Sequence, residues 1–297
     1  MTDMMEDRVV IVGANGQFGR IWAHKLAALG ADIAGMDLQP GLADPLVCKT
    51  YLASSIDDLT EPAAELIAGA DYVLLCVPED AILKSLPRLC ALMKPDSLLM
   101  DIASVKTRIH QALETLDPTF GYLSLHPMFG PTDDFTDRAV CLIPVRENAG
   151  ARRIEAIIAG WGARISTLTA EQHDTAAAFV QALPHIALIA FGAALDSSGV
   201  NFDLIWNIAT PIQKTMLALV SRVVSGEHDT YWSIQSANPF SEAARDKLGT
   251  ELGLASAIVQ NGDEQGFSKK LESISRYLGD SADRLEKVSD TVVSITK

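Results

Sequence analysis

Apolar residues in the first half of the chain alternate between short continuous runs and stretches with helical spacing. Residues 18–29 and 81–93 place apolar side chains three and four positions apart, as in an amphipathic helix. Short apolar runs occupy 8–12, 31–38, 72–77, 97–102, 121–125, 139–144 and 162–168. Runs alternating with helices predict an α/β domain, with a mostly parallel sheet covered by helices on both faces.

The pattern changes at about residue 169, after which nearly all of the chain has helical spacing. Residues 176–195 are apolar on almost every side, and no Lys or Arg occurs between 172 and 213. Pro184 and neighbouring polar residues interrupt this stretch, which predicts a buried helix and not a membrane span. A small helical half would expose such a surface unless it packed against a second copy. We therefore predict an all-α helical dimerisation domain over residues 170–297 and a homodimer.

The charge balance limits the partners. The chain of 297 residues has 38 acidic and 24 basic side chains, for a net charge of −14. This surface disfavours nucleic acid and anionic membranes, since both need a basic surface. The polar start of the chain is unlike a signal peptide, and the four cysteines show no metal-ligand spacing. These features predict a cytoplasmic protein with free thiols and no metal site.

A glycine-rich loop follows the first apolar run and precedes a helix. Its sequence, GANGQFG over 13–19, has the form GxxGxxG where the strict dinucleotide fingerprint is GxGxxG. Asp37 ends the second run, where a carboxylate binds the ribose 2′-hydroxyl and repels a 2′-phosphate. The alternatives are a structural turn and a turn aspartate. We predict a Rossmann-type nucleotide-binding domain over 1–169 that binds NAD in preference to NADP. The predicted cofactor-binding residues are Gly13, Ala14, Asn15, Gly16, Gln17, Phe18, Gly19, Asp37, Val77, Pro78 and Ser104.

Two further loops carry residues that are candidates for catalysis. DIASVK over 101–106 closes the fourth main run, and LHPMFGP over 125–131 closes the fifth. Ligands of an open parallel sheet bind beyond the carboxyl ends of its strands, so both loops should face the nicotinamide. His126, held by the proline after it, is a candidate base near neutral pH, and the alternative is a histidine that caps a loop.

These motifs, together with EQHD over 171–174 and QALPH over 181–185, resemble the prephenate/arogenate dehydrogenase family. The resemblance extends from about residue 8 to at least 231 and continues weakly beyond. The few residues before the first run are too short for the chorismate mutase domain fused to some members, so a monofunctional enzyme is expected. The family oxidatively decarboxylates a cyclohexadienol with NAD(P)+.

The resemblance implies roles for residues of the nucleotide-binding half. His126 matches the catalytic histidine that accepts the hydrogen bond of the ring hydroxyl, and Ser104 matches a catalytic serine that orients hydroxyl, nicotinamide and histidine. Lys106 matches the lysine of the SVK motif, whose role stays open. A loop-stabilising ion pair between Lys106 and Asp101 is the alternative.

The helical half supplies the candidate substrate-binding residues. Thr210 and Pro211 predict the start of a helix that carries Arg222, which matches the family arginine that grips the substrate carboxylate. Lys214 stands where relatives often have a second arginine. Of two family-matching histidines, we favour His185, one turn from Gln181, in the substrate pocket. The other, His173, is expected to hold the interdomain junction or to neighbour the helix cap. The predicted substrate-binding residues are Arg222, His185, Lys214 and Gln181.

The predicted function is oxidative decarboxylation of prephenate to 4-hydroxyphenylpyruvate, in the tyrosine branch of aromatic amino-acid biosynthesis, or of arogenate to tyrosine. One alternative is a 4-amino-4-deoxyprephenate dehydrogenase of secondary metabolism. Another is a 3-hydroxyacid dehydrogenase, which needs a lysine that the cation-free segment lacks. A third is a non-catalytic NAD-binding regulator, which would not need the histidine, serine and arginine. The sequence leaves the exact substrate and feedback inhibition by tyrosine open.

Overall fold

The computed structural model describes residues 3–39, 44, 47–226 and 228–295. The chain forms two compact units, Met1–Asp174 and Thr175–Lys297. The predicted domain boundary after residue 169 falls slightly before this division, at the start of a helix that spans it. The first unit holds the sheet, and the regular secondary structure of the described part of the second unit consists of helices.

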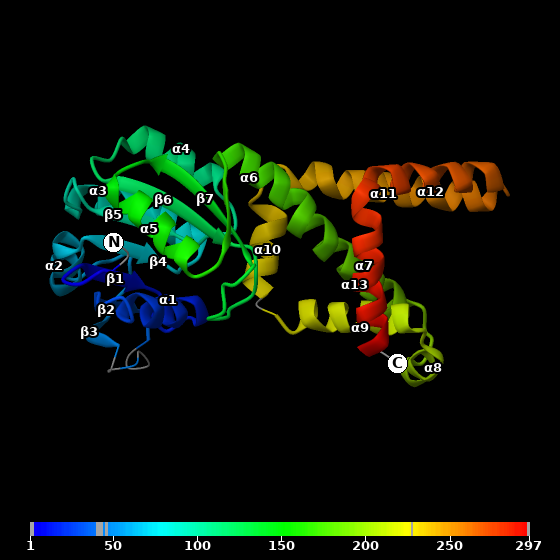
Figure 1. Cartoon of the computed structure of the whole chain (residues 1–297), viewed down its shortest axis with the longest axis horizontal. Helices are drawn as coiled ribbons and strands as arrows, with labels where there is room; N and C mark the ends of the chain where they lie inside the picture. The colour runs from blue at the N-terminus through cyan, green and yellow to red at the C-terminus, as the bar shows by residue number, and fades with distance from the viewer. Residues whose placement is uncertain (1–2, 40–43, 45–46, 227, 296–297) are drawn as a thin grey trace. The chain divides into compact units, whose positions relative to one another are not determined.

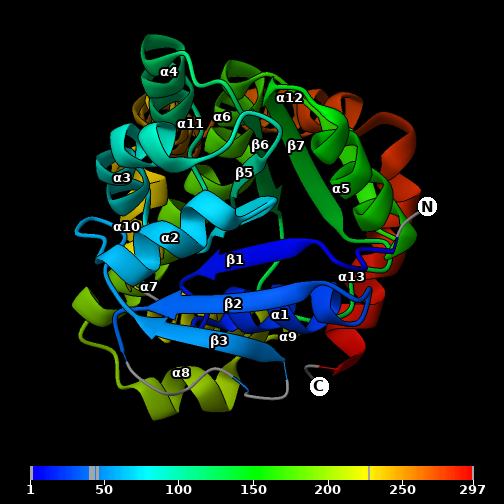
Figure 2. The same ribbon diagram turned by 90° about the vertical axis from the view of Figure 1, so that its left-hand side faces the viewer.

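An eight-stranded sheet forms the centre of the first unit (Figure 1). Its strand order is β3-β2-β1-β4-β5-β6-β7-β8, and all neighbours are parallel except the antiparallel pair β6 and β7. Figure 2 shows β1, β2 and β3 side by side at one edge. The strands are β1 (Arg8–Val12), β2 (Asp32–Asp37), β3 (Cys48–Ala53), β4 (Tyr72–Leu75), β5 (Leu98–Asp101), β6 (Gly121–Pro127), β7 (Ala139–Arg146) and β8 (Arg164–Thr167).

Helices cover both faces of this sheet, as the pattern predicts. Val9 and Ile11 of β1 pack toward α1 and α5, whereas Val10 and Val12 pack toward α2, α3 and α4. This alternation follows from the two-residue period of a strand, which sends successive side chains to opposite faces. The helices are α1 (Gln17–Ala27), α2 (Glu61–Gly69), α3 (Glu79–Leu92), α4 (Thr107–Leu116) and α5 (Ala149–Gly160).

Strand β3 is absent from the sequence prediction. Its sequence, CKTYLA, has no continuous apolar run, because an edge strand pairs with a single neighbour and needs less apolar surface. The prediction of a mostly parallel sheet from the remaining runs is confirmed.

The second unit is built from helices, and none of its described residues lies in a strand. Thr210 is the N-cap of α9 and accepts a hydrogen bond from the backbone N–H of Gln213, with Pro211 in the first turn, as predicted. The helical elements from residue 170 onward are α6 (Ala170–Ala177), η1 (Ala178–Ala182), α7 (Leu183–Ser197), α8 (Phe202–Ile208), α9 (Pro211–Val224), α10 (His228–Ser236), α11 (Ser241–Gln260), α12 (Glu264–Leu278), η2 (Gly279–Ser281) and α13 (Ala282–Ile295).

The apolar helical stretch Ala170–Ser197 differs from its prediction in two ways. Its middle, η1, is a π-helical turn directly before the segment that contains Pro184. A wider turn accommodates a proline, which cannot donate the usual backbone hydrogen bond. The stretch is long enough to span a membrane, and its most apolar window of 18 residues has a mean hydropathy of 1.8, yet only 11% of that window is buried in this chain. The prediction that it is a buried helix is therefore wrong for the single chain.

Candidate active site

Four predicted loops lie at one edge of the sheet because their strands are parallel. The glycine loop follows β1, Val77 and Pro78 follow β4, and Ser104 follows β5. His126 lies near the end of β6, which is parallel to β5. The carboxyl ends of these strands form the edge where open α/β sheets bind ligands. Phe129 of the histidine loop also packs against Phe18 of α1, with ring centroids 6.4 Å apart.

The glycine loop has the geometry of a dinucleotide cradle. Gly13 has a φ of +80°, and a Cβ there would lie 2.3 Å from the carbonyl oxygen of Cys76. A Cβ on Gly19 would lie 2.1 Å from the carbonyl oxygen of Gly13. Gly16 caps α1 without any side-chain hydrogen bond, so the first N–H groups of the helix are available to an anion. These residues fit a bound pyrophosphate, although the spacing departs from the strict fingerprint.

Asp37 ends β2 beside this loop. Its Oδ2 accepts a hydrogen bond from the backbone N–H of Asn15 at 2.9 Å, and the Asn15 side chain donates to the Tyr51 hydroxyl at 2.8 Å. The half-buried carboxylate is thus tied to the cradle and presents negative charge where a 2′-phosphate of NADP would lie.

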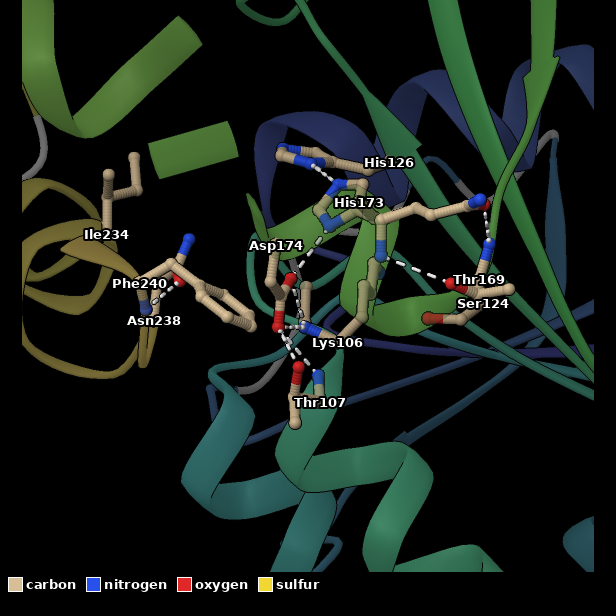
Figure 3. Close-up of polar contacts among 12 residues, drawn as sticks. Lys106, Thr107, Ser124, His126, Thr169, His173, Asp174, Ile234, Asn238 and Phe240 are labelled. Carbon is tan, nitrogen blue, oxygen red and sulfur yellow. Dashed lines mark hydrogen bonds and ion pairs between the residues drawn. The ribbon is translucent and has the colours of Figure 1, made fainter. Parts of the chain in front are cut away.

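His126 belongs to a hydrogen-bonded chain that begins at the end of β6 (Figure 3). Its side chain is buried, and its Nδ1 lies 2.8 Å from Nε2 of His173. His173 Nδ1 in turn lies 2.8 Å from Oδ1 of Asp174. Thr169 and Gln172 make the reciprocal capping bonds of α6, so His173 directly follows the cap in the first turn of the helix.

Asp174 ends this chain and binds the start of α4. Its carboxylate accepts hydrogen bonds from the backbone N–H groups of Lys106 and Thr107 and from the Thr107 hydroxyl, at 2.6 to 3.1 Å. Free N–H groups at a helix start favour a negative charge. Burial would raise the pKa of Asp174, but the hydrogen bonds from His173 and Thr107 lower it below its ordinary value. Asp174 therefore stays an anion.

Lys106 lies buried beneath the same loop. Its Nζ is 2.8 Å from Oδ1 of Asp101 and donates to the Leu125 carbonyl at 2.7 Å. Asp101 also accepts hydrogen bonds from the Ala103 backbone and from the hydroxyls of Tyr122 and Ser124. The ion pair expected between Lys106 and Asp101 is thus present.

The surroundings of His126 favour its neutral form. Burial is the largest cause, followed by the positive charge of Lys106 and by His173, and together they lower the pKa of His126 well below 6.5. A neutral imidazole is the form that accepts a proton. The sequence pointed to His126 but not to its partners, although His173 and Asp174 lie within the EQHD motif.

The predicted residues of the helical half lie on three elements. Gln181 is in η1, and the half-buried His185 of α7 packs edge-on against Tyr231 with ring centroids 4.8 Å apart. Burial lowers the pKa of His185, and its Nδ1 has no hydrogen-bond partner among the described residues. On α9, Arg222 is exposed and has no carboxylate partner within the described chain. Lys214 Nζ lies 5.7 Å from the Trp206 ring centroid.

A cavity of about 700 Å³ lies within the helical unit beside this group. None of the predicted substrate-binding residues lines this cavity, although Tyr231, which packs against His185, does. The cavity is therefore adjacent to the predicted substrate site and distinct from it. The lining residues are Ile186, Ile189, Val223, Val224, Gly226, His228, Tyr231, Trp232, Gln235, Ser236 and Arg245.

The chain matches two family models in succession. Residues 27–167 match the nucleotide-binding domain of prephenate dehydrogenase, and residues 169–273 match its dimerization domain. A 4-amino-4-deoxyprephenate dehydrogenase from Streptomyces pristinaespiralis is 33% identical over 282 residues, which cover 95% of this chain and 94% of that protein. A T-protein from Enterobacter agglomerans is 30% identical over 283 residues, 93% of this chain and 69% of the relative.

Solved structures share the fold at low sequence identity. The arogenate dehydrogenase of Synechocystis superimposes with a TM-score of 0.71 at 20% identity, covering 94% of this chain and 99% of that one. The prephenate dehydrogenase of A. aeolicus, in complex with hydroxyphenyl propionate and NAD+, gives 0.72 at 18% identity, with 95% and 99% coverage.

The fold and the edge of the sheet define a nucleotide-dependent oxidoreductase with a helical second half. This chain belongs to the prephenate dehydrogenase family. The predicted family and fold class are confirmed.

Proposed function

We propose that this chain is an NAD-dependent dehydrogenase that oxidatively decarboxylates prephenate to 4-hydroxyphenylpyruvate or arogenate to tyrosine. The observation that carries the proposal is His126, a histidine at the ligand-binding edge whose burial and neighbouring charges favour its neutral form. His126 takes the proton of the ring hydroxyl, and Ser104 orients that hydroxyl. Residues 13–19 and Asp37 would hold NAD+, which would supply the hydride acceptor.

The remaining proposed residues bind the substrate or border the cofactor. Arg222 would pair with the substrate carboxylate through its fork of donors, and Lys214 would supply a second cation. His185 and Gln181 would bind polar groups of the substrate. The turn after β4 would border the nicotinamide. The cofactor-binding set is Gly13, Ala14, Asn15, Gly16, Gln17, Phe18, Gly19, Asp37, Val77, Pro78 and Ser104.

A second candidate substrate is 4-amino-4-deoxyprephenate. The relative from Streptomyces pristinaespiralis favours it, since the similarity covers nearly the full length of both chains. The same scaffold would oxidise a ring carbon that carries an amine in place of the hydroxyl.

We also propose that the chain is a cytoplasmic homodimer. The dimerization-domain match over residues 169–273 supports a dimer through the helical half. A second copy of this chain would cover the exposed apolar surface of the stretch Ala170–Ser197. All four cysteines are free thiols, as expected in a reducing compartment.

A substrate panel tests the activity. Purified protein is incubated with NAD+ or NADP+ and with prephenate, arogenate or 4-amino-4-deoxyprephenate, and NADH and CO2 are measured. We expect one of them to be turned over with NAD+. His126→Asn should lower kcat by roughly 10²–10⁴ through loss of the base, with a small change in KM. His24→Asn, on the exposed face of α1, is the matched control. Binding of NAD+ without turnover of any of the three substrates would reject the proposal.

A further inference from the structure

Two side chains, His173 and Asp174, continue the hydrogen-bonded chain from His126 into the interior. We propose that His126, His173 and Asp174 form a proton relay that stores the hydroxyl proton of the substrate on His173 during the reaction. This inference rests on the proposed role of His126 as the base. Each link is 2.8 Å long, and all three side chains are almost fully buried (Figure 3). His173 and Asp174 act through His126 and are positioning residues.

The hydrogen bonds determine which nitrogen carries each proton. Asp174 is held as a carboxylate by the N–H groups at the start of α4, so it can accept but not donate. His173 Nδ1 must therefore carry a proton, and neutral His173 then accepts at Nε2. Its partner, His126 Nδ1, must be the donor of the link between the rings. Neutral His126 thus carries its lone pair at Nε2, where it can take a proton from the substrate.

The charges around the two rings give the relay its direction. Lys106, a buried cation, opposes a positive charge on His126, whereas Asp174 lies against His173 and favours one there. After His126 accepts a proton at Nε2, passing its Nδ1 proton to His173 moves the charge from the side of Lys106 to the side of Asp174. In the low dielectric of the protein interior, moving the charge in this way changes the electrostatic energy more than it would in water.

Other charged and titratable groups of the first unit surround the pair. On β5, Asp101 is paired with Lys106, and on β7, Cys141 lies opposite His126 in the strand register. On α3, the charge of Asp174 reaches Glu79, which is itself paired with Arg108. The Lys106 charge is thus partly balanced by Asp101, while Asp174 faces His173 directly.

The relay takes up one proton from the substrate and later returns it to the product, so the relay neither gains nor loses a proton over the reaction. The substrate O–H bond breaks as the His126 Nε2–H bond forms, and the His126 Nδ1–H bond breaks as the His173 Nε2–H bond forms. The ring hydrogen leaves with its electron pair to the bound NAD+, and the hydroxyl carbon becomes a carbonyl. The bond to the ring carboxylate then breaks, CO2 leaves, and the electron pair makes the ring aromatic with a phenolate oxygen. The reverse proton transfers return the stored proton to that oxygen.

The variant His173→Gln separates proton storage from hydrogen bonding. Its amide oxygen can accept from His126 Nδ1 but cannot take the proton. We expect kcat to fall about 10- to 100-fold with KM changed less than about twofold. The acid limb of the kcat–pH profile should move to lower pH, because His126 alone must then hold the proton beside Lys106. Asp174→Asn should move the limb in the same direction, and the solvent deuterium isotope effect should change in both.

His110→Gln is the matched control, since His110 pairs with Glu114 on α4 outside the relay. An unchanged acid limb and isotope effect in a folded His173→Gln protein would overturn the relay. If the variants do not fold, nitrogen NMR of histidine-labelled wild-type protein without ligands decides. Both relay histidines should be neutral with the proton on Nδ1, and a proton on His126 Nε2 would overturn the proposal. The substrate panel tests the proposed function separately.

Discussion

Lys106 and Asp101 place opposite charges in the interior, where each side chain is at most 1% exposed. Such a pair gains stability from its mutual attraction only when further hydrogen bonds satisfy both groups. Here Lys106 also donates a hydrogen bond to the Leu125 carbonyl. Asp101 also accepts hydrogen bonds from the hydroxyls of Tyr122 and Ser124. The pair joins the ends of β5 and β6 and fixes the loop that leads from Ser104 into α4.

Removing one member of this pair should be costly. Lys106→Met leaves the Asp101 charge buried without its cation and should lower the free energy of unfolding by about 3–5 kcal/mol, measured by urea denaturation. Lys94→Met is the matched control, because Lys94 and Asp71 form a partly exposed pair, and pairs that water reaches are worth about 1 kcal/mol or less. Adding Asp101→Asn to Lys106→Met should recover part of the loss. Equal costs for Lys106→Met and Lys94→Met would contradict the assignment.

At the scale of elements, turns with special geometry determine where the functional loops lie. The junction of β1 and α1 needs Gly13 both for its positive φ and for its close approach to Cys76. The π-helical turn η1 lies between the helix with the relay residues His173 and Asp174 and the helix with His185. Its wider turn departs from the 3.6-residue repeat of a regular α-helix.

Gly13→Ala tests the cradle as an element. Gly199 also has a positive φ, +71°, but a Cβ there meets nothing within 4 Å, so Gly199→Ala isolates the backbone strain at about 1–2 kcal/mol. Gly13→Ala adds the clash with the Cys76 carbonyl and should cost more stability in thermal unfolding. It should also weaken NAD+ binding, measured by calorimetry, whereas Gly199→Ala should leave binding unchanged. Similar NAD+ affinity in both variants would argue against the proposed cofactor site.

For the whole molecule, apolar surface on the helical half is the dominant feature. In α12, the side chains of Phe267, Leu271 and Ile274 are each about half exposed and recur at helical spacing. No residue of α7, α12 or α13 is buried within the chain. A monomer would expose this surface to water, at a cost of roughly 25 cal/mol for each Å² left uncovered.

Leu271→Asp tests whether a second copy covers this surface. We expect the wild-type protein, purified without detergent, to be a dimer by light scattering coupled to gel filtration. Leu271→Asp should shift it toward monomer, because burying an unpaired carboxylate in an apolar interface is unfavourable. Lys269→Asp, an exposed change on another face of α12, should leave the dimer intact. A monomeric wild-type protein, or equal effects of the two substitutions, would reject the dimer.

The sequence by itself determined the order and class of the elements. Local patterns suffice for this: apolar runs predict strands, helical spacing predicts helices, and Thr210 with Pro211 marks the start of α9. The edge strand β3 escaped prediction because its pattern is weak and its pairing with β2 is not local. The glycine pattern predicted the loop over 13–19, and the family motifs singled out His126 and Ser104.

The tertiary structure decided which of these residues act on one another. His126 and His173 are 47 positions apart, and only the packing of α6 against the strand ends brings their rings within hydrogen-bond distance. The same packing places Asp174 at the start of α4, 67 and 68 positions from its backbone donors. Protonation states follow from such long-range contacts because burial and neighbouring charges determine the cost of ionising each group. The sequence therefore pointed to His126 as the proposed base, and the fold supplied the burial and the neighbouring charges that favour its neutral form.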